Sequence, residues 1–217
     1  MSDYKLSPSI FAADLGHIAD QLAELEAARI EMLHVDVLDG HFVERMAFGA
    51  DHIRALKKLT SIPLDVHLMV EKPERILDDI LDAGADIVTV HQESTAMLTA
   101  CLEKIRAAGA KAGVVLSPAT PAETLSCVLD QVDMILCMTI NPGAWGKQPF
   151  KADVLKKVTR LREMLDGRDI DIEVDGSVDD KNIAMARDAG ANVFVSGGYL
   201  FSDIASNAQA LRDALAA

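Results

Sequence analysis

The sequence predicts a single (β/α)8 barrel, an α/β fold in which parallel strands form a closed ring inside a layer of helices. Three observations predict it: a series of short apolar runs rich in β-branched residues, longer stretches with helical spacing between them, and glycines at the junctions. No linker, low-complexity tract or shift in composition divides the chain. We therefore expect residues 1–217 to form one domain.

The strand-like runs alternate with helical stretches along the whole chain. The expected strands cover residues 5–10, 32–38, 64–70, 86–91, 111–117, 134–140, 171–175 and 192–197. Between them apolar residues recur at helical spacing, as in Ile18, Leu22 and Leu25. Strands that alternate regularly with helices are typical of parallel βαβ units.

Glycines mark the predicted ends of helices. The tripeptide Ala-Gly-Ala recurs at 83–85, 108–110 and 189–191, each time where a helix should end and a strand begin, which suits a left-handed C-cap. An open, doubly wound sheet is the main alternative. It usually has fewer strands, and the first strand here is not followed by a Gly-x-Gly-x-x-Gly turn. These points favour the closed barrel.

Composition and charge exclude several classes of function. No run approaches the ~18 apolar residues of a membrane-spanning helix, and the N-terminus lacks the pattern of a secretory signal, so we expect a cytoplasmic protein without a membrane partner. The formal net charge of -13 makes nucleic acid a poor partner. It does not exclude a small phosphate ester, because backbone N–H groups at helix N-termini can bind one phosphate.

Polar side chains stand near the predicted strand ends, where such barrels carry their chemistry. His34 and Asp36 are two residues apart on one strand and therefore share a face, with Leu33, Val35 and Val37 on the other. We expect the polar pair to point into the barrel and the aliphatic residues to face the helices.

His67 and Asp175 lie near the ends of two similar predicted strands, with Asp65 and Glu173 two residues earlier on the same faces. A lone histidine in a strand is usually a hydrogen-bonded core residue, and a buried carboxylate is costly unless it is paired or coordinated. No Lys or Arg in the strands stands near Asp36 or Asp175. A divalent metal among His34, Asp36, His67 and Asp175 would compensate their charge, so a core role and a metal site both stay open.

Glycine-rich segments follow the last three predicted strands, at 141–146, 176–177 and 197–198. In this fold the last βα loops and a short helix N-terminus often bind a phosphate group. The alternative is that the glycines only make turns. Three such segments on consecutive strands favour a phosphate site.

Five segments together resemble the ribulose-phosphate 3-epimerase family over nearly the whole chain. They are Ser-Pro-Ser-Ile at 7–10, His-Val-Asp-Val-Leu-Asp-Gly-His-Phe-Val at 34–43, Leu-Asp-Val-His-Leu-Met at 64–69, Asn-Pro-Gly at 141–143 and Glu-Val-Asp-Gly at 173–176. The resemblance implies an isomerase: a metal-dependent enzyme that interconverts D-ribulose 5-phosphate and D-xylulose 5-phosphate through an enediolate.

The resemblance also implies roles for individual residues. His34, Asp36, His67 and Asp175 would hold one divalent ion, zinc, iron, manganese or cobalt, and Asp36 and Asp175 would be the acid/base pair. A small phosphorylated ketose would be the ligand, and relatives often assemble, so we expect a homo-oligomer. The residues expected to bind the substrate are Ser9, His67, Met69, Met138, Gly143, Ala144, Trp145, Gly146, Gly176, Ser177, Gly197 and Gly198.

The chain departs from the family pattern in four places around the expected sugar site. The family usually has methionine at Leu38, Pro-Asn at Glu44-Arg45 and glycine at Ser177. After 141–143 it usually continues Phe-Gly-Gly-Gln, whereas this chain has Ala-Trp-Gly-Lys-Gln at 144–148 and is one residue longer. Asp-Gly-Ser at 175–177 and Gln-Pro-Phe at 148–150 are similar to the branch that acts on D-allulose 6-phosphate. A ketohexose phosphate therefore stays an alternative substrate.

Two other classes of protein share this architecture. Sugar-phosphate decarboxylases and aldol-type synthases typically carry Asp-x-Lys-x-x-Asp on a strand, and no predicted strand here has it. A barrel that only binds a ligand should have lost one of the carboxylates, yet Asp36 and Asp175 are both present. Both alternatives are therefore less favoured than an epimerase.

Overall fold

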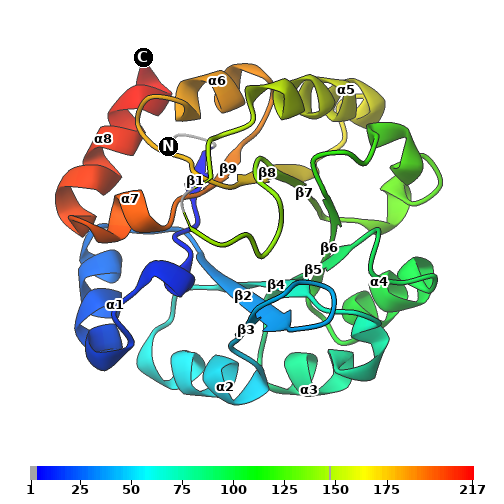
Figure 1. The fold of residues 1–217 in the computed structure, drawn as a ribbon, viewed down its shortest axis with the longest axis horizontal. Coiled ribbons are helices and arrows are strands. Elements are labelled where there is room, and N and C mark those ends of the chain that lie inside the picture. The colour runs from blue at the N-terminus through cyan, green and yellow to red at the C-terminus, as the bar shows by residue number, and fades with distance from the viewer. Residues whose placement is uncertain (1–3, 147) are drawn as a thin grey trace.

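The fold is the predicted (β/α)8 barrel, described by a computed structural model for residues 4–146 and 148–217. Its strands are arranged in the order β1-β9-β8-β7-β6-β5-β4-β2-β3, and all neighbours are parallel except β2 and β3. Figure 1 looks into the ring that the parallel strands form. These strands are β1 (Lys5–Leu6), β2 (Leu33–Asp39), β4 (Leu64–Met69), β5 (Ile87–His91), β6 (Lys111–Leu116), β7 (Met134–Met138), β8 (Asp171–Asp175) and β9 (Val193–Val195).

Helices surround the ring (Figure 1). They are α1 (Ile18–Ala27), α2 (Ala50–Leu59), α3 (Leu77–Asp82), α4 (Leu98–Ala107), α5 (Leu155–Leu165), α6 (Ile183–Asp188), α7 (Gly198–Phe201) and α8 (Ile204–Ala216). Between β6 and β7 the described chain has two 3-10 helices in place of an α-helix, η4 (Ala122–Leu125) and η5 (Leu129–Gln131). None of the described helices is long and apolar enough to cross a membrane.

The ring closes between β1 and β2. Ser9 and His34 form a parallel bridge, and the backbone N–H of His34 donates to the carbonyl of Pro8 at 3.0 Å. The first strand is much shorter than the predicted 5–10, because Pro8 has no N–H to continue the ladder and the chain turns into the 3-10 helix η1 (Ile10–Ala12). The last strand is also shorter than the predicted 192–197, since the chain turns at Gly197 into α7.

The two faces of each strand bury different partners. Leu33, Val35 and Val37 of β2 belong to the main hydrophobic core, which they share with residues of the helices. Inside the ring, a separate apolar cluster closes the bottom of the barrel: Met32, Ile87, Met134 and Val193. These four come from alternate strands or their first flanking residue, the layering usual for this fold. The polar inward residues of β2 therefore lie above this layer, toward the C-terminal ends of the strands.

The sequence analysis missed strand β3 (Met46–Ala47), which pairs antiparallel with the end of β2. Asp39 shapes the loop between them, because Oδ1 accepts from the backbone N–H groups of His41 and Phe42 and Oδ2 accepts from that of Glu71. This loop lies over the C-terminal mouth of the barrel (Figure 1), so it forms part of the wall around the site.

Candidate active site

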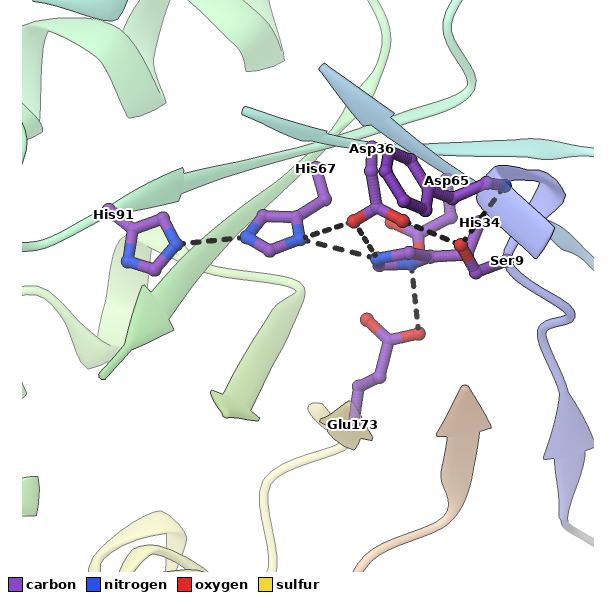
Figure 2. A network of polar contacts seen from close by, with 8 residues as sticks. Ser9, His34, Asp36, Asp65, His67, His91 and Glu173 are labelled. Atoms are coloured by element: carbon purple, nitrogen blue, oxygen red, sulfur yellow. Dashed lines mark hydrogen bonds and ion pairs between the residues drawn. The ribbon is translucent and has the colours of Figure 1, made fainter. Parts of the chain in front are cut away.

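His34 of β2 is the centre of a buried polar network (Figure 2). Its Nδ1 lies 2.6 Å from Oδ2 of Asp65 on the neighbouring strand β4. Its Nε2 lies 3.3 Å from both Oδ1 of Asp36 and Nδ1 of His67. The alternation of β2 points His34 and Asp36 into the barrel as predicted, and the parallel register places Asp65 beside His34.

The surroundings of His34 favour a positive charge. Burial opposes the charged imidazole, but the charges of Asp36 and Asp65 outweigh it and hold the pKa of His34 well above its ordinary value. In the metal-free chain a proton on Nε2 therefore lies between the ring and the acceptors that face it. A cation at this point, either a proton on His34 or a metal ion, would compensate the negative charges of Asp36 and Asp65.

His67 of β4 is oriented from the opposite side by His91 of β5. His67 Nε2 lies 2.9 Å from His91 Nε2, and His91 Nδ1 lies 3.0 Å from Oε2 of Glu93 (Figure 2 shows the two rings). Burial lowers the pKa of His67, and it lowers that of His91 to about 4. Both imidazoles are therefore neutral near pH 7, and each has one N–H and one lone pair.

Glu93 sets the direction of this chain of hydrogen bonds. Burial opposes its ionisation, but hydrogen bonds from His91, Thr120 and the backbone N–H of Ser117 lower the pKa of Glu93 to about 2. Its carboxylate can only accept, so His91 Nδ1 carries the proton and His91 Nε2 accepts from His67 Nε2–H. The lone pair of His67 is therefore on Nδ1, which lies 3.1 Å from Oδ1 of Asp36.

The two candidate catalytic carboxylates have pKa values shifted in opposite directions. Burial opposes ionisation of Asp36, but the charge of His34 and its hydrogen bond hold the pKa of Asp36 below the ordinary value. Ser9 Oγ also donates to Oδ2 of Asp36 at 2.6 Å. Burial raises the pKa of Asp175 to about 7, and the charges of Asp36 and Asp65 add to this effect against the opposing charge of His34. Near neutral pH one carboxylate is ionised and the other holds a proton about half of the time.

The donor atoms fit a divalent metal. Ligand atoms of His34, Asp36, His67 and Asp175 all lie within 4.8 Å of one another. The Nδ1 lone pair of His67 and Oδ1 of Asp36 both face Nε2 of His34, so a metal ion there would replace the proton that the metal-free site requires. Mixed imidazole and carboxylate donors accept zinc, iron, manganese or cobalt.

A second buried acidic group lies beneath this cluster. Glu173 of β8 approaches Nδ1 of His34 to 3.7 Å, and its two carboxyl oxygens have no hydrogen-bond partner among the described residues. Burial, with the nearby charge of Asp65, raises the pKa of Glu173 well above its ordinary value. Asp65, which shares an inward face with His67, therefore forms the hydrogen bond that orients the His34 ring, and Glu173 lies next to this pair.

A cavity of about 600 Å³ opens above the network. Its wall contains both expected catalytic residues, Asp36 and Asp175, and most of the residues expected to bind the substrate: Ser9, Met69, Met138, Gly143, Ala144, Gly146, Gly176, Ser177, Gly197 and Gly198. His34 and His67 are fully buried and do not form part of the wall. Trp145 is 66% exposed and lies outside the wall as well.

Close packing explains why two positions of the cavity wall require glycine. Gly176 has φ +128°, and a Cβ there would lie 2.6 Å from Cγ1 and 2.8 Å from the backbone nitrogen of Ile140. Gly143 has φ +64°, and a Cβ there would lie 2.4 Å from Cβ of Val43. Any other residue at these positions would clash with these neighbours and strain the backbone.

The sequence analysis missed several residues of the wall, among them Phe11, Arg45, Gln148, Asp179 and Tyr199. Arg45 and Gln148 lie at the departures from the family pattern, which were the available signal. Phe11 and Tyr199 each stand within two residues of an expected ligand-binding residue, but neither residue type indicates such a role by itself.

Solved structures with the same fold include several enzymes. A 3-hexulose-6-phosphate synthase superposes with a TM-score of 0.69 at 22% identity, covering 97% of this chain and 99% of that one. The crystal structure of KGPDC from Streptococcus mutans gives a TM-score of 0.79 at 14% identity, covering 99% of this chain and 98% of that one. At these identities the likeness shows the barrel fold alone.

Sequence comparison is more specific. The model of the ribulose-phosphate 3-epimerase family matches residues 5–201. The chloroplastic ribulose-5-phosphate-3-epimerase of Arabidopsis thaliana is 43% identical over 204 residues, which are 92% of this chain and 72% of that protein. The ribulose-phosphate 3-epimerase of Bacillus subtilis is 39% identical over 200 residues, 91% of this chain and 92% of that protein. With this match over nearly its whole length, the chain belongs to the ribulose-phosphate 3-epimerase family and is an isomerase.

Proposed function

We propose that this enzyme interconverts D-ribulose 5-phosphate and D-xylulose 5-phosphate through an enediolate, with Asp36 and Asp175 as the acid/base pair. The observation that carries the proposal is the contrast between these carboxylates in one cavity wall: the pKa of Asp36 is lowered and that of Asp175 is raised to about 7. Carboxyl groups whose environments push their pKa values apart are suited to opposite roles in proton transfer.

The reaction needs two proton-transfer groups on opposite sides of the sugar. A proton next to the ketone leaves one face of carbon 3, and another returns to the opposite face. Asp36 projects from β2 and Asp175 from β8, and β1 and β9 lie between these strands in the ring. In one direction the ionised Asp36 removes the proton and protonated Asp175 returns one, and in the reverse direction the roles are exchanged.

The surrounding residues hold this pair in place. Ser9 Oγ donates to Oδ2 of Asp36, which keeps the carboxylate turned toward the cavity. Asp65 accepts from Nδ1–H of His34 and leaves Nε2 directed at the cluster. A divalent ion held by His34, Asp36, His67 and Asp175 would act as a Lewis acid that stabilises negative charge on the substrate oxygens beside the reacting carbon.

The glycine segments are the proposed site for the phosphate end of the substrate. Gly143, Gly146, Gly176, Gly197 and Gly198 all form part of the cavity wall, on the loops after β7, β8 and β9. Without side chains they expose backbone N–H groups to a ligand. In this proposal the phosphate binds at these loops, and the carbon chain extends from there to Asp36 and Asp175.

A parallel assay of two sugars tests the proposal. We expect purified protein to contain about one equivalent of divalent metal and to epimerise D-ribulose 5-phosphate faster than D-allulose 6-phosphate, with the activity lost in chelator and restored by metal. Faster turnover of the hexulose phosphate would favour the alternative substrate. Asp-Gly-Ser, which contains Ser177, and Gln-Pro-Phe, which contains Pro149, are similar to the family branch that acts on that sugar. Turnover of neither sugar by metal-loaded protein would contradict the proposal.

A further inference from the structure

Arg45 lies where three loops meet at the mouth of the barrel. Its guanidinium carbon is 4.4 Å from the ring centroid of Phe11, after β1, and 4.7 Å from that of Trp145, after β7. Its Nη1 also donates to the carbonyl of Ala144 at 3.4 Å. Arg45 itself stands between β2 and β3. Two of the departures from the family pattern, Arg45 and Trp145, are therefore in direct contact.

Backbone packing supports this position of Arg45. Val43, two residues before it, fills the space beside Gly143, where a Cβ would lie 2.4 Å from Cβ of Val43. The loop after β2 and the loop after β7 are therefore packed together at two successive points, Val43 against Gly143 and Arg45 against Ala144. Arg45 is partly exposed and forms part of the cavity wall.

Arg45 differs in charge from the other charged residues of the cavity wall. Among the described residues of the wall, Arg45 is the one Lys or Arg, whereas Asp36, Asp175 and Asp179 are acidic. The chain as a whole has a formal net charge of -13. A phosphorylated sugar approaches such a cavity against an unfavourable field. The glycine segments offer hydrogen-bond donors, but they carry no full positive charge.

We propose that Arg45 binds the phosphate group of the substrate and thereby determines specificity for phosphorylated sugars, an inference that rests on the proposed function. Nη1 donates to the carbonyl of Ala144, and Ala144 belongs to the same loop as Gly143 and Gly146, two of the glycines that are proposed to bind the phosphate. Of the guanidinium donors, only Nη1 makes a hydrogen bond within the described residues. The remaining N–H groups suit a phosphate, which Arg can bind in bidentate fashion.

The contacts with the two rings prepare Arg45 for this role. A cation over an aromatic face is attracted to the ring and does not use its N–H donors to achieve this. Phe11 and Trp145 therefore restrict the side chain and reduce the entropy that phosphate binding would cost. A structural role alone, in which Arg45 only joins the loops, is the competing explanation that the experiment must separate.

Trp145 supplies a readout that does not depend on turnover, because it is the single tryptophan of the chain. Inorganic phosphate is titrated into wild type and into Arg45→Met and Arg45→Lys, and Trp145 fluorescence gives the dissociation constant. Losing charged hydrogen bonds should raise that constant roughly tenfold to a hundredfold in Arg45→Met. Arg45→Lys should be intermediate, since it keeps the charge but loses the planar fork. The control Arg54→Met removes a side chain of α2 that is paired with Asp51, and it should match wild type.

Steady-state kinetics provide a second test of the role of Arg45. We expect Arg45→Met to raise KM for D-ribulose 5-phosphate with kcat nearly unchanged, because a phosphate contact is made equally in the ground and transition states. Absence of saturable phosphate binding to wild type, or equal affinity in Arg45→Met, would overturn the proposal. A lower kcat at unchanged KM would overturn it as well, in favour of a structural role. Failure of the proposed function would instead appear as absent turnover with intact, Arg45-dependent phosphate binding.

Discussion

His67 Nε2 lies 2.9 Å from Nε2 of His91, and this contact determines which nitrogen of His67 is free to bind a metal. Glu93 accepts from the other nitrogen of His91 at 3.0 Å, so the donor direction runs from His67 through His91 to the carboxylate. The lone pair of His67 is left on Nδ1, facing Asp36. Glu93, which lies outside the candidate metal site, therefore sets the tautomer of a residue within that site.

Glu93→Gln tests this control with almost no change in volume. A Gln amide that accepts from the backbone N–H of Ser117 presents its NH₂ to His91, which reverses the hydrogen-bond chain and places the proton of His67 on Nδ1. We expect metal affinity to fall roughly 10- to 100-fold, measured by competition with a chelator. Glu163→Gln, an exposed change on α5, is the matched control. Wild-type affinity in Glu93→Gln would disprove the tautomer argument.

Asp175 makes the stability of the metal-free enzyme depend on pH. Its pKa is about 7 in the folded chain and near 4 in the unfolded chain, so the folded state binds the proton more tightly. This contribution to the free energy of unfolding is complete below pH 4 and is lost as pH rises through 7. Between these two pKa values the loss is on the order of 1.4 kcal/mol for each pH unit. In chelator, the difference in free energy of unfolding between wild type and Asp175→Asn should therefore change across this interval. A difference that is constant from pH 4 to 8 would contradict the assigned pKa.

Gly176→Ala should be far more destabilising than Gly109→Ala. Both glycines have positive φ, but an added Cβ at Gly176 would lie 2.8 Å from the backbone nitrogen of Ile140, whereas at Gly109 it meets nothing within 4 Å. Gly109→Ala therefore tests backbone strain alone, about 1 kcal/mol, and Gly176→Ala adds a clash with a rigid neighbour, for a total of at least about 3 kcal/mol. Urea unfolding measures both. Equal losses of unfolding free energy in the two variants would show that the loop after β8 moves to accommodate the added Cβ at little cost.

The sequence predicted the barrel and the convergence of four polar side chains because both depend on short, regular periodicities, whereas their role as metal ligands was implied by the family resemblance. Alternation along β2 alone directs His34 and Asp36 inward, and the rule that chemistry gathers at the strand ends brings His67 and Asp175 to the same place. The roles of Asp36, His67 and the other expected site residues remain predictions that the experiments described above test.

Features that depend on contacts between distant loops were not predictable. The stack of Arg45 with Phe11 and Trp145 joins three loops whose relative placement no local pattern encodes. His91 was visible as a polar residue at a strand end, but its orientation by Glu93 depends on the loop after β5. The length of the first strand was overestimated, because the expected strand was extended across Pro8 to Ile10, and Pro8 has no N–H to continue the hydrogen-bond ladder.

The central claim is that Asp36 and Asp175 exchange protons with opposite faces of carbon 3. The most direct test is NMR of D-ribulose 5-phosphate incubated in D₂O with metal-loaded wild type, Asp36→Asn and Asp175→Asn. We predict that wild type forms xylulose 5-phosphate with deuterium at carbon 3, and that both variants epimerise at least about 100-fold more slowly. Product that retains its original hydrogen at carbon 3, or full epimerisation by either variant, would contradict the two-carboxylate mechanism.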